Sequence, residues 1–523
     1  MNNLRKMPVG IQDFEKLREN GFVYVDKTQY IYQLVQFGVP YFLGRPRRFG
    51  KSLFLSTLKA YFEGRRELFK GLDIAGLEKD WTPYPVIYLD FNYSEYSDVQ
   101  TLEIVLDCML KDYEEKYNIQ DIAAKPSIRF KRLIAEIYKK TGQRVVVLVD
   151  EYDKSLVNTL DKPDVNEKIR DVLKGFYGVL KGADAHLKFM FLTGVTKISK
   201  VDVFNDLNQL VDISMDKNFA GICGISEEEL LHDFQPEMHA LADKYRLTFD
   251  EVFQKLKKRH GGYHFAKRSE NMYNPFSVLN TFAMLDFSCY WFATDTPAFL
   301  VKALRSQKYD IFKFDNNVQI AAISIMDYRS EAQNLISLLY QSGYLTIKAY
   351  DNVLDEYTLG FPNDEVKYGF LNELLSTYVL TPIATGNFSV TGFLKQLMEN
   401  DVEGFMTSLQ SFFASISYKA IKQKHCDEQY YQHVFYLLFS IMGQFVESEV
   451  KNNKERVDAV VKTADNIYVF AFKMDKNATA KNALKQINDK HYAIPYKPDH
   501  RKVVKIGVKF SQKTRNVKRW ITK

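Results

Sequence analysis

The chain has 523 residues, of which 46% are hydrophobic and 26% are charged, and its formal net charge is +6. This length exceeds what one hydrophobic core supports and indicates about two to four domains. The composition is that of an ordinary soluble globular protein, and the small positive excess permits a nucleic-acid partner without arguing for one.

The first part of the chain, about 220 residues, alternates short apolar strands with amphipathic helices. Strand-helix alternation of this kind predicts a doubly wound α/β fold with a parallel sheet. The uninterrupted apolar run at 145–149 is typical of a strand that is buried on both faces. We expect strands at 41–43, 86–89, 145–149, 187–192 and 210–213, and helices at 52–62, 101–117 and 128–140.

From about residue 226 the pattern becomes mainly helical. A predicted helix at 335–341 precedes two predicted strands at 343–347 and 356–360. A helix followed by a β-hairpin is the outline of a winged helix, although a structural packing module accounts for the same pattern. Amphipathic helix returns at 390–440 and strands return from residue 457. The chain is therefore divided into segments 1–225, 226–380 and 381–523.

Gly50-Lys51-Ser52 stands between a predicted strand and a predicted helix. The lysine can reach the β- and γ-phosphates of a nucleotide, the serine can ligate Mg²⁺, and the helix N-terminus offers free N–H groups. The loop departs from the usual P-loop pattern because Arg45 stands at the first glycine position, and neighbouring arginines bring positive charge to it. The predicted nucleotide-binding residues are Arg45, Arg47, Arg48, Phe49, Gly50, Lys51, Ser52 and Leu53.

Asp150 and Glu151 directly follow the buried strand. We expect Asp150 to hold Mg²⁺ together with Ser52, and Glu151 to polarise the attacking water. Thr193 ends the next strand, where it would lie beside Asp150 and sense the γ-phosphate. The predicted catalytic residues are thus Glu151, Lys51 and Thr193. A chance G-K-S followed by a strand that ends in acid is the alternative, and the order of all the parts along the chain disfavours it.

Six short motifs together carry a resemblance to a known family. They are PVGIQDF at 8–14, YVDKT at 24–28, RPRRFGKSL at 45–53, VDEYD at 149–153, GYHF at 262–265 and YNPFS at 273–277. The set resembles the bacterial AAA-ATPase-like proteins that carry a C-terminal PD-(D/E)XK nuclease domain. The resemblance covers most of the chain. It implies ATP and Mg²⁺ as ligands, a restriction-endonuclease-like α/β fold at the C-terminus, and an arginine-rich P-loop as the family's own variant.

A nuclease of this kind needs carboxylates that gather Mg²⁺ and a lysine near the attacking water. Glu447 and Glu449 stand at an expected helix end. Glu449, together with Asp458 and Lys473 on two strands and Gln486 on a helix, falls where the family's motif residues fall. Side chains alternate along a strand, so Ala471 shares a face with Lys473. Ala471 therefore stands where a second metal carboxylate is needed, and we expect metal-dependent cleavage to be impaired.

Three outcomes remain open for this domain: an inactive nuclease fold that still binds DNA or RNA, an active nuclease in which Glu449 or Glu447 replaces the missing ligand, and a structural remnant. Residues 497–523 contain ten Lys or Arg and one Asp. Two interpretations are open: these cations bind a nucleic-acid phosphate backbone, or they cover the solvent-exposed face of the sheet and protect its edge.

The cysteines are widely spaced, which argues against a zinc site or a disulfide framework. With no secretory signal and no run of roughly 18 apolar residues, we expect a cytoplasmic protein without a membrane span. The predicted function is ATP binding and hydrolysis coupled to a nuclease-like domain of doubtful activity. The alternative is a non-cleaving, nucleotide-dependent switch or scaffold that binds a protein or a nucleic acid. The sequence does not define the oligomer.

Overall fold

The structure is a computed structural model that forms two compact units. Unit 1 comprises Met1–Asp295 and Phe314–Glu365, and unit 2 comprises Thr296–Lys313 and Val366–Lys523. The structure describes residues 5–120, 122–197, 210–292, 300–301, 303–304, 309–314, 318–326, 335–379, 390–420, 428–443, 447–453, 456–473, 478–489, 494–496, 499–511, 513–514 and 516–523. It describes only the backbone of 417–420, 428–432, 447–453, 456–458 and 494. The three segments predicted from the sequence stay a prediction.

Unit 1 is built on a five-stranded parallel sheet with the order β2-β3-β4-β1-β5. The strands are β1 (Tyr41–Gly44), β2 (Val86–Asp90), β3 (Val145–Asp150), β4 (Leu187–Gly194) and β5 (Val211–Asp212). The β-branched run that forms β3 is completely buried, as its apolar pattern predicts. This order confirms the predicted α/β sheet and places β4 between β1 and β3.

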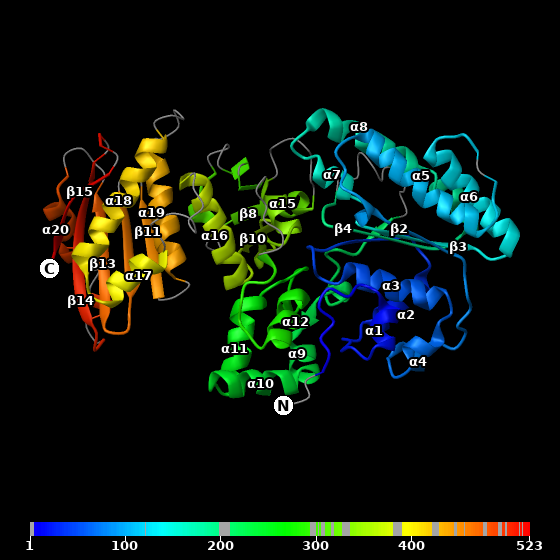
Figure 1. Ribbon diagram of the computed structural model, residues 1–523, viewed down its shortest axis with the longest axis horizontal. Helices are drawn as coiled ribbons and strands as arrows, with labels where there is room; N and C mark the ends of the chain where they lie inside the picture. Colours follow the sequence, from blue (N-terminus) through cyan, green and yellow to red (C-terminus); the bar gives the residue numbers. More distant parts are fainter. Residues whose placement is uncertain are drawn as a thin grey trace. The chain divides into compact units, whose positions relative to one another are not determined.

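Helices lie on both faces of this sheet (Figure 1). On one face, α3 lies with α1 and α2, and on the other lie α5, α6 and α8. Their bounds are α1 (Phe14–Glu19), α2 (Thr28–Phe37), α3 (Lys51–Phe62), α4 (Ile74–Leu77), α5 (Val99–Lys116), α6 (Pro126–Thr141), α7 (Lys154–Asn158) and α8 (Pro163–Gly178). The three helices predicted here from amphipathic patterning are confirmed within two residues, which is the usual uncertainty of helix ends.

A helical group follows the sheet within unit 1. It consists of β6 (Ile225–Ser226), α9 (Glu227–Asp233), α10 (Gln235–Tyr245), α11 (Phe249–His260), β7 (Met272–Tyr273) and α12 (Pro275–Met284). Helix α11 begins in a capping box, in which the Thr248 hydroxyl accepts the N–H of Glu251 and the Glu251 carboxylate accepts the N–H of Thr248. Apolar side chains of α9 to α12 share one buried cluster.

The predicted helix and hairpin near residue 340 are also present. They form α15 (Leu335–Gln341), β9 (Thr346–Asp351) and β10 (Glu356–Gly360), preceded by β8 (Val318–Ala321) and α14 (Ala322–Ile325). Strand β9 begins later than predicted because Gly343, at φ +87°, turns the chain after the helix. Strand β8 was not predicted, and it completes a three-stranded sheet of order β8-β10-β9. The winged-helix assignment stays a prediction.

Unit 2 contains a five-stranded sheet of order β11-β12-β13-β14-β15, with helices packed on it (Figure 1). Helix α16 (Asp364–Val379) begins in unit 1 and continues into unit 2. The remaining elements are α17 (Val390–Met398), α18 (Val402–Ala420), α19 (Glu428–Met442), β11 (Glu447–Asn453), β12 (Arg456–Lys462), β13 (Asn466–Lys473), α20 (Ala480–Asp489), β14 (Lys502–Ser511) and β15 (Asn516–Thr522). All neighbouring pairs are antiparallel except β13 and β14.

One prediction in this region is wrong. Glu447 and Glu449 do not lie at a helix end, because α19 ends at Met442 and both residues belong to β11. Strand β11 pairs with β12 along its whole length, from Glu447 opposite Lys462 to Asn453 opposite Arg456. These ladder hydrogen bonds outweigh the helix propensity of glutamate and lysine, a common effect of tertiary context.

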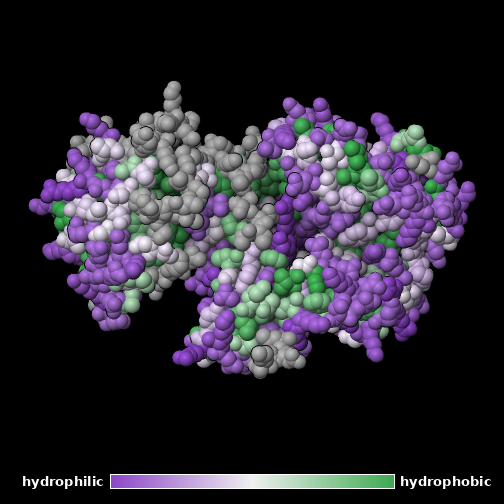
Figure 2. All heavy atoms as spheres, viewed as in Figure 1, coloured by the Kyte–Doolittle hydropathy of each residue, from purple (hydrophilic) through white to green (hydrophobic). Residues whose placement is uncertain are grey.

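Figure 2 shows mostly hydrophilic residues over α5, α6 and α8 of unit 1. Among the described helices, none is long and apolar enough to cross a membrane.

Candidate nucleotide site

The phosphate loop connects β1 to α3, and its backbone turns sharply at Arg48 and Gly50. Gly50 has φ +98°, a left-handed conformation that costs glycine little, and α3 begins at the next residue, Lys51. Arg48 has φ +63°, which is unfavourable for a residue with a side chain. The first N–H groups of α3 have no partner within the helix, so the turn directs hydrogen-bond donors into the loop.

Lys51 lies inside this loop, with 3% of its side chain exposed. Its ammonium donates to the carbonyl oxygens of Arg45 at 3.0 Å and Pro46 at 3.2 Å. It also lies 3.0 Å from the Glu151 carboxylate. The predicted phosphate-binding lysine and the predicted catalytic glutamate therefore form a buried ion pair.

Arg45 and Arg48 of the loop have different surroundings. The Arg45 guanidinium is buried and donates to the backbone carbonyls of Gly44, Ser214 and Phe219. Burial lowers the pKa of Arg45. The Arg45 side chain therefore ties the start of the loop to the segment after β5. Its predicted contact with the nucleotide stays a prediction. The Arg48 guanidinium stacks over the Phe276 ring at 4.1 Å.

Asp150, Ser52 and Thr193 meet at the carboxyl ends of β3 and β4 and the start of α3. The Thr193 hydroxyl donates to Asp150 at 2.6 Å, and Ser52 also hydrogen-bonds this carboxylate. Tyr88 of β2 is a further hydrogen-bond partner of Asp150 that the sequence did not single out. Burial, together with the nearby Glu151 charge, raises the pKa of Asp150 to about 6.

This arrangement fits Mg²⁺. A magnesium ion prefers oxygen ligands and keeps several waters, so a hydroxyl and a carboxylate side by side are a sufficient protein contribution. Among the described residues there is no cluster of three or more His, Cys, Asp or Glu that suits a metal.

Glu151 has φ +51° and only 8% exposure. Burial alone would raise the pKa of its carboxyl group, but the charges of Lys51, then Arg47 and Lys154, lower that pKa below its ordinary value. The carboxylate is thus ionised at neutral pH, as a general base must be. The unfavourable backbone angle of a non-glycine residue is of the kind found at functional sites.

Residues after the two acids hold the end of β4 in place. Asp153 accepts hydrogen bonds from the N–H and hydroxyl of Thr196, both at 2.6 Å, and the Tyr152 hydroxyl donates to the Thr196 carbonyl at 2.8 Å. Burial, followed by the Glu151 charge, raises the pKa of Asp153. Tyr152 and Asp153 belong to the VDEYD motif. The motif marked these residues, but the sequence did not predict their hydrogen bonds to Thr196.

A mainly apolar cavity borders the loop within unit 1. Its volume is about 80 Å³, and it is partly open to solvent. The lining includes Pro8, Tyr24, Val25, Lys27, Phe49, Gly50, Leu53, Ile225, Pro275 and Leu279. The YVDKT motif thus contributes to the cavity. Its Asp26 carboxylate also accepts the N–H groups of Thr28 and Asp73, so it fixes the turn before α2.

In the nuclease-like region, Ala471 is fully buried in an apolar cluster with Val469, Ala483 and Ile487. Its register partner on β12 is Asp458, so the two residues share a face of the sheet. Lys473 follows on the same face, opposite Lys509 of β14, and Gln486 lies on α20. The side chains of Glu449 and Asp458 lie outside the described residues, so their predicted metal ligation stays a prediction.

Comparisons with known proteins agree with this geometry. Residues 8–204 match the family described as "Predicted AAA-ATPase", and residues 426–520 match "PD-(D/E)XK nuclease superfamily". A protein of Azotobacter chroococcum mcd 1, described as "Uncharacterized protein in vnfD 5'region", is 37% identical over 524 residues, which cover 98% of both chains. The chain belongs to the AAA-ATPase-like family with a C-terminal PD-(D/E)XK nuclease-superfamily domain. Within this family the phosphate loop described above falls in the ATPase part, and Ala471 falls in the nuclease-superfamily part.

Proposed function

We propose that this AAA-ATPase-like chain binds and hydrolyses ATP with Mg²⁺ in unit 1. The observation that carries the proposal is the convergence of Lys51, Ser52, Asp150, Glu151 and Thr193 from the ends of three neighbouring elements. Each has the chemistry that a phosphoryl-transfer site needs. The bound Mg²⁺ would neutralise charge on the β- and γ-phosphates.

The residues then have distinct tasks. Lys51 exchanges its Glu151 contact for the phosphates, which releases the carboxylate to orient the attacking water. Ser52 and Asp150 hold the metal ion, and Thr193 hydrogen-bonds Asp150 from the next strand, where it is placed to detect the γ-phosphate. The base would lie against the cavity beside Gly50 and Leu53, because this cavity is apolar and borders the phosphate loop directly.

The raised pKa of Asp150 predicts a pH-dependent metal requirement. Below the pKa of about 6, a proton occupies the carboxylate and competes with Mg²⁺. The Mg²⁺ concentration for half-maximal phosphate release should therefore rise roughly tenfold per pH unit below this value and stay level above it. Phosphate release from ATP, measured against Mg²⁺ over roughly pH 5 to 8, tests this directly. An unchanged Mg²⁺ requirement across the range, or an Asp150→Asn variant with wild-type turnover, would contradict the assignment.

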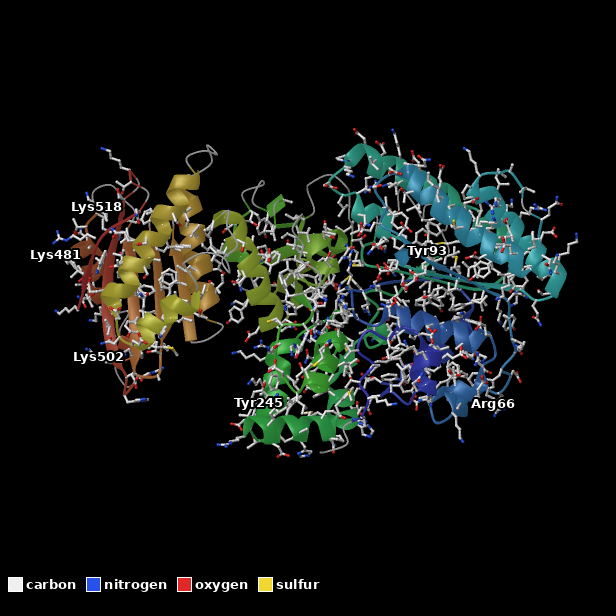
Figure 3. The ribbon with its side chains drawn as sticks, in the orientation of Figure 1. Arg66, Tyr93, Tyr245, Lys481, Lys502 and Lys518 are labelled. Carbon is white, nitrogen blue, oxygen red and sulfur yellow. The ribbon has the colours of Figure 1, made fainter. Side chains whose placement is uncertain are left out.

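For unit 2 we propose nucleic-acid binding with weak or absent cleavage. Two observations support it: Ala471 in place of the second acid, and the cations of the last strands. Lys502 of β14 and Lys518 of β15 are exposed, as is Lys481 of the neighbouring helix α20 (Figure 3). ATP turnover in unit 1 would regulate this binding. The non-cleaving switch is therefore favoured over an active nuclease.

Phosphate contacts predict a steep salt dependence. The logarithm of the DNA association constant should fall linearly with the logarithm of salt concentration, with a slope of about −0.9 for each phosphate neutralised. Exchanging Lys502 and Lys518 for glutamine should reduce the slope by roughly two, as measured by fluorescence anisotropy. The matched control exchanges the exposed Lys168 and Lys174 of α8, and it should leave the slope unchanged. Salt-independent binding would contradict the phosphate contacts.

A further inference from the structure

Several carbonyl groups of the phosphate loop accept hydrogen bonds from identifiable donors. Those of Arg45 and Pro46 accept from Lys51, that of Phe49 accepts the N–H of Gly224 at 3.0 Å, and that of Gly50 accepts the N–H of Phe54 at 3.0 Å. The carbonyl of Arg47 accepts from the indole Nε1–H of Trp291 at 3.2 Å, from 244 positions along the chain. Within one trans peptide, the C=O of a residue and the N–H of the next point in opposite directions. The bond from Trp291 thus sets the direction of the Arg48 N–H.

Trp291 is itself held firmly. Its side chain is 1% exposed, and its backbone N–H donates to the Glu365 carboxylate at 2.7 Å. The other Glu365 oxygen hydrogen-bonds His260 at 2.8 Å, and His260 contacts the Thr281 hydroxyl at 3.0 Å. All of these groups are buried, so the hydrogen bonds are shielded from competition with water. A polar chain therefore runs from α11 and α12, through the first turn of α16, to the indole.

The loop needs such support because its sequence does not favour its shape. Arg45 replaces a glycine, Pro46 has no N–H to offer, and Arg48 adopts a left-handed backbone conformation. Further contacts brace the same loop: Phe49 packs edge-on against Tyr263 at 4.8 Å, and a Cβ at Gly343 would come within 2.7 Å of Pro46. Among these contacts, the Trp291 bond acts on a peptide group in the middle of the loop.

We propose that Trp291 is a positioning residue for phosphate binding, whose indole fixes the Arg47–Arg48 peptide so that the Arg48 N–H faces the nucleotide phosphates. Glu365 and His260 fix Trp291 in turn. This proposal rests on the proposed ATP site and adds a residue outside the P-loop and the two acids. It also links the phosphate loop to Glu365 in the first turn of α16, within unit 1.

The test compares Trp291→Phe with a matched Trp81→Phe control. Phenylalanine keeps an aromatic ring but removes the donor. Trp81 lies in the same unit, packed against Tyr61 and Phe69, and has no described bond to the loop. Trp291→Phe should weaken MgATP binding about fivefold, the effect of one lost hydrogen bond, and leave the affinity for adenosine unchanged because adenosine has no phosphates. Trp81→Phe should change neither affinity.

A second measurement uses a folded protein with an intact site. In the Trp81→Phe/Trp520→Phe variant, Trp291 is the one remaining tryptophan of the sequence's three. Its fluorescence should shift when MgATP is added and stay constant with adenosine. Provided that wild type binds MgATP, three results would overturn the inference. The Trp291→Phe variant could bind MgATP as tightly as wild type, or lose affinity for MgATP and adenosine equally. The third is a Trp291 fluorescence that does not change when MgATP is added. Failure of wild type to bind MgATP would instead reject the proposed function.

Discussion

Glu151→Gln should abolish most ATP turnover while preserving ATP binding. The glutamine is nearly isosteric and keeps the backbone, but it cannot accept a proton from the attacking water. Loss of a general base typically lowers kcat by roughly 100- to 10,000-fold. Affinity for MgATP should stay equal or improve, because Lys51 no longer has to leave an ion pair with Glu151 to reach the phosphates. Steady-state phosphate release and equilibrium binding measure the two effects separately.

A matched control is Glu103→Gln on α5, which makes the same chemical change at an exposed position. It should leave turnover and affinity at wild-type values. Turnover by Glu151→Gln within threefold of wild type would exclude Glu151 as the base (threefold is about 0.7 kcal/mol). Loss of binding together with turnover would instead assign Glu151 a structural role.

Ala471→Glu should have the largest effect in unit 2, and the effect should depend on metal. The substitution restores the acid-x-Lys pattern, but it also inserts a carboxylate into an apolar cluster. An unpaired buried charge costs roughly 3 to 5 kcal/mol, which corresponds to a fall in melting temperature of about 10 °C. If Asp458 and residue 471 share a metal site, Mn²⁺ or Mg²⁺ should recover much of this loss. Thermal melts with and without metal measure it.

Ala483→Glu provides the control, since Ala483 is buried in the same cluster but lies on α20, outside the motif. It should be destabilised to a similar extent and gain nothing from metal. Equal recovery of both variants would argue against a vestigial metal site. Strong nucleic-acid cleavage by the wild type, lost in Lys473→Ala, would overturn the expectation that Ala471 impairs catalysis.

The sequence was most informative about the site residues whose positions follow from the order of strands and helices along the chain. Asp150 and Thr193 lie at the ends of two strands, Lys51 begins the helix that follows a third, and parallel strands bring their carboxyl ends to one edge. The structure accordingly places them together. The strand order, with β4 between β1 and β3, could not be obtained from local patterns, because it depends on pairing between distant segments.

Other features escaped sequence reasoning for definite physical reasons. The Trp291 bond to the loop joins residues 244 positions apart, and no local periodicity marks it. Arg45 was expected to bring charge to the loop, but its two terminal nitrogens donate to backbone carbonyls that only the folded chain places nearby. Glu447 and Glu449 favour a helix by propensity, whereas pairing along β12 makes them part of a strand.

The most direct test of the ATP site is a calorimetric titration of MgATP into the full chain and into its Lys51→Ala variant. The Lys51 ammonium is buried in the loop and would make charge-assisted hydrogen bonds to phosphate. We predict saturable binding to wild type and an affinity roughly 10- to 100-fold weaker in the variant, with no turnover. Unchanged ATP binding and hydrolysis by Lys51→Ala would contradict the assignment of this loop as the nucleotide site.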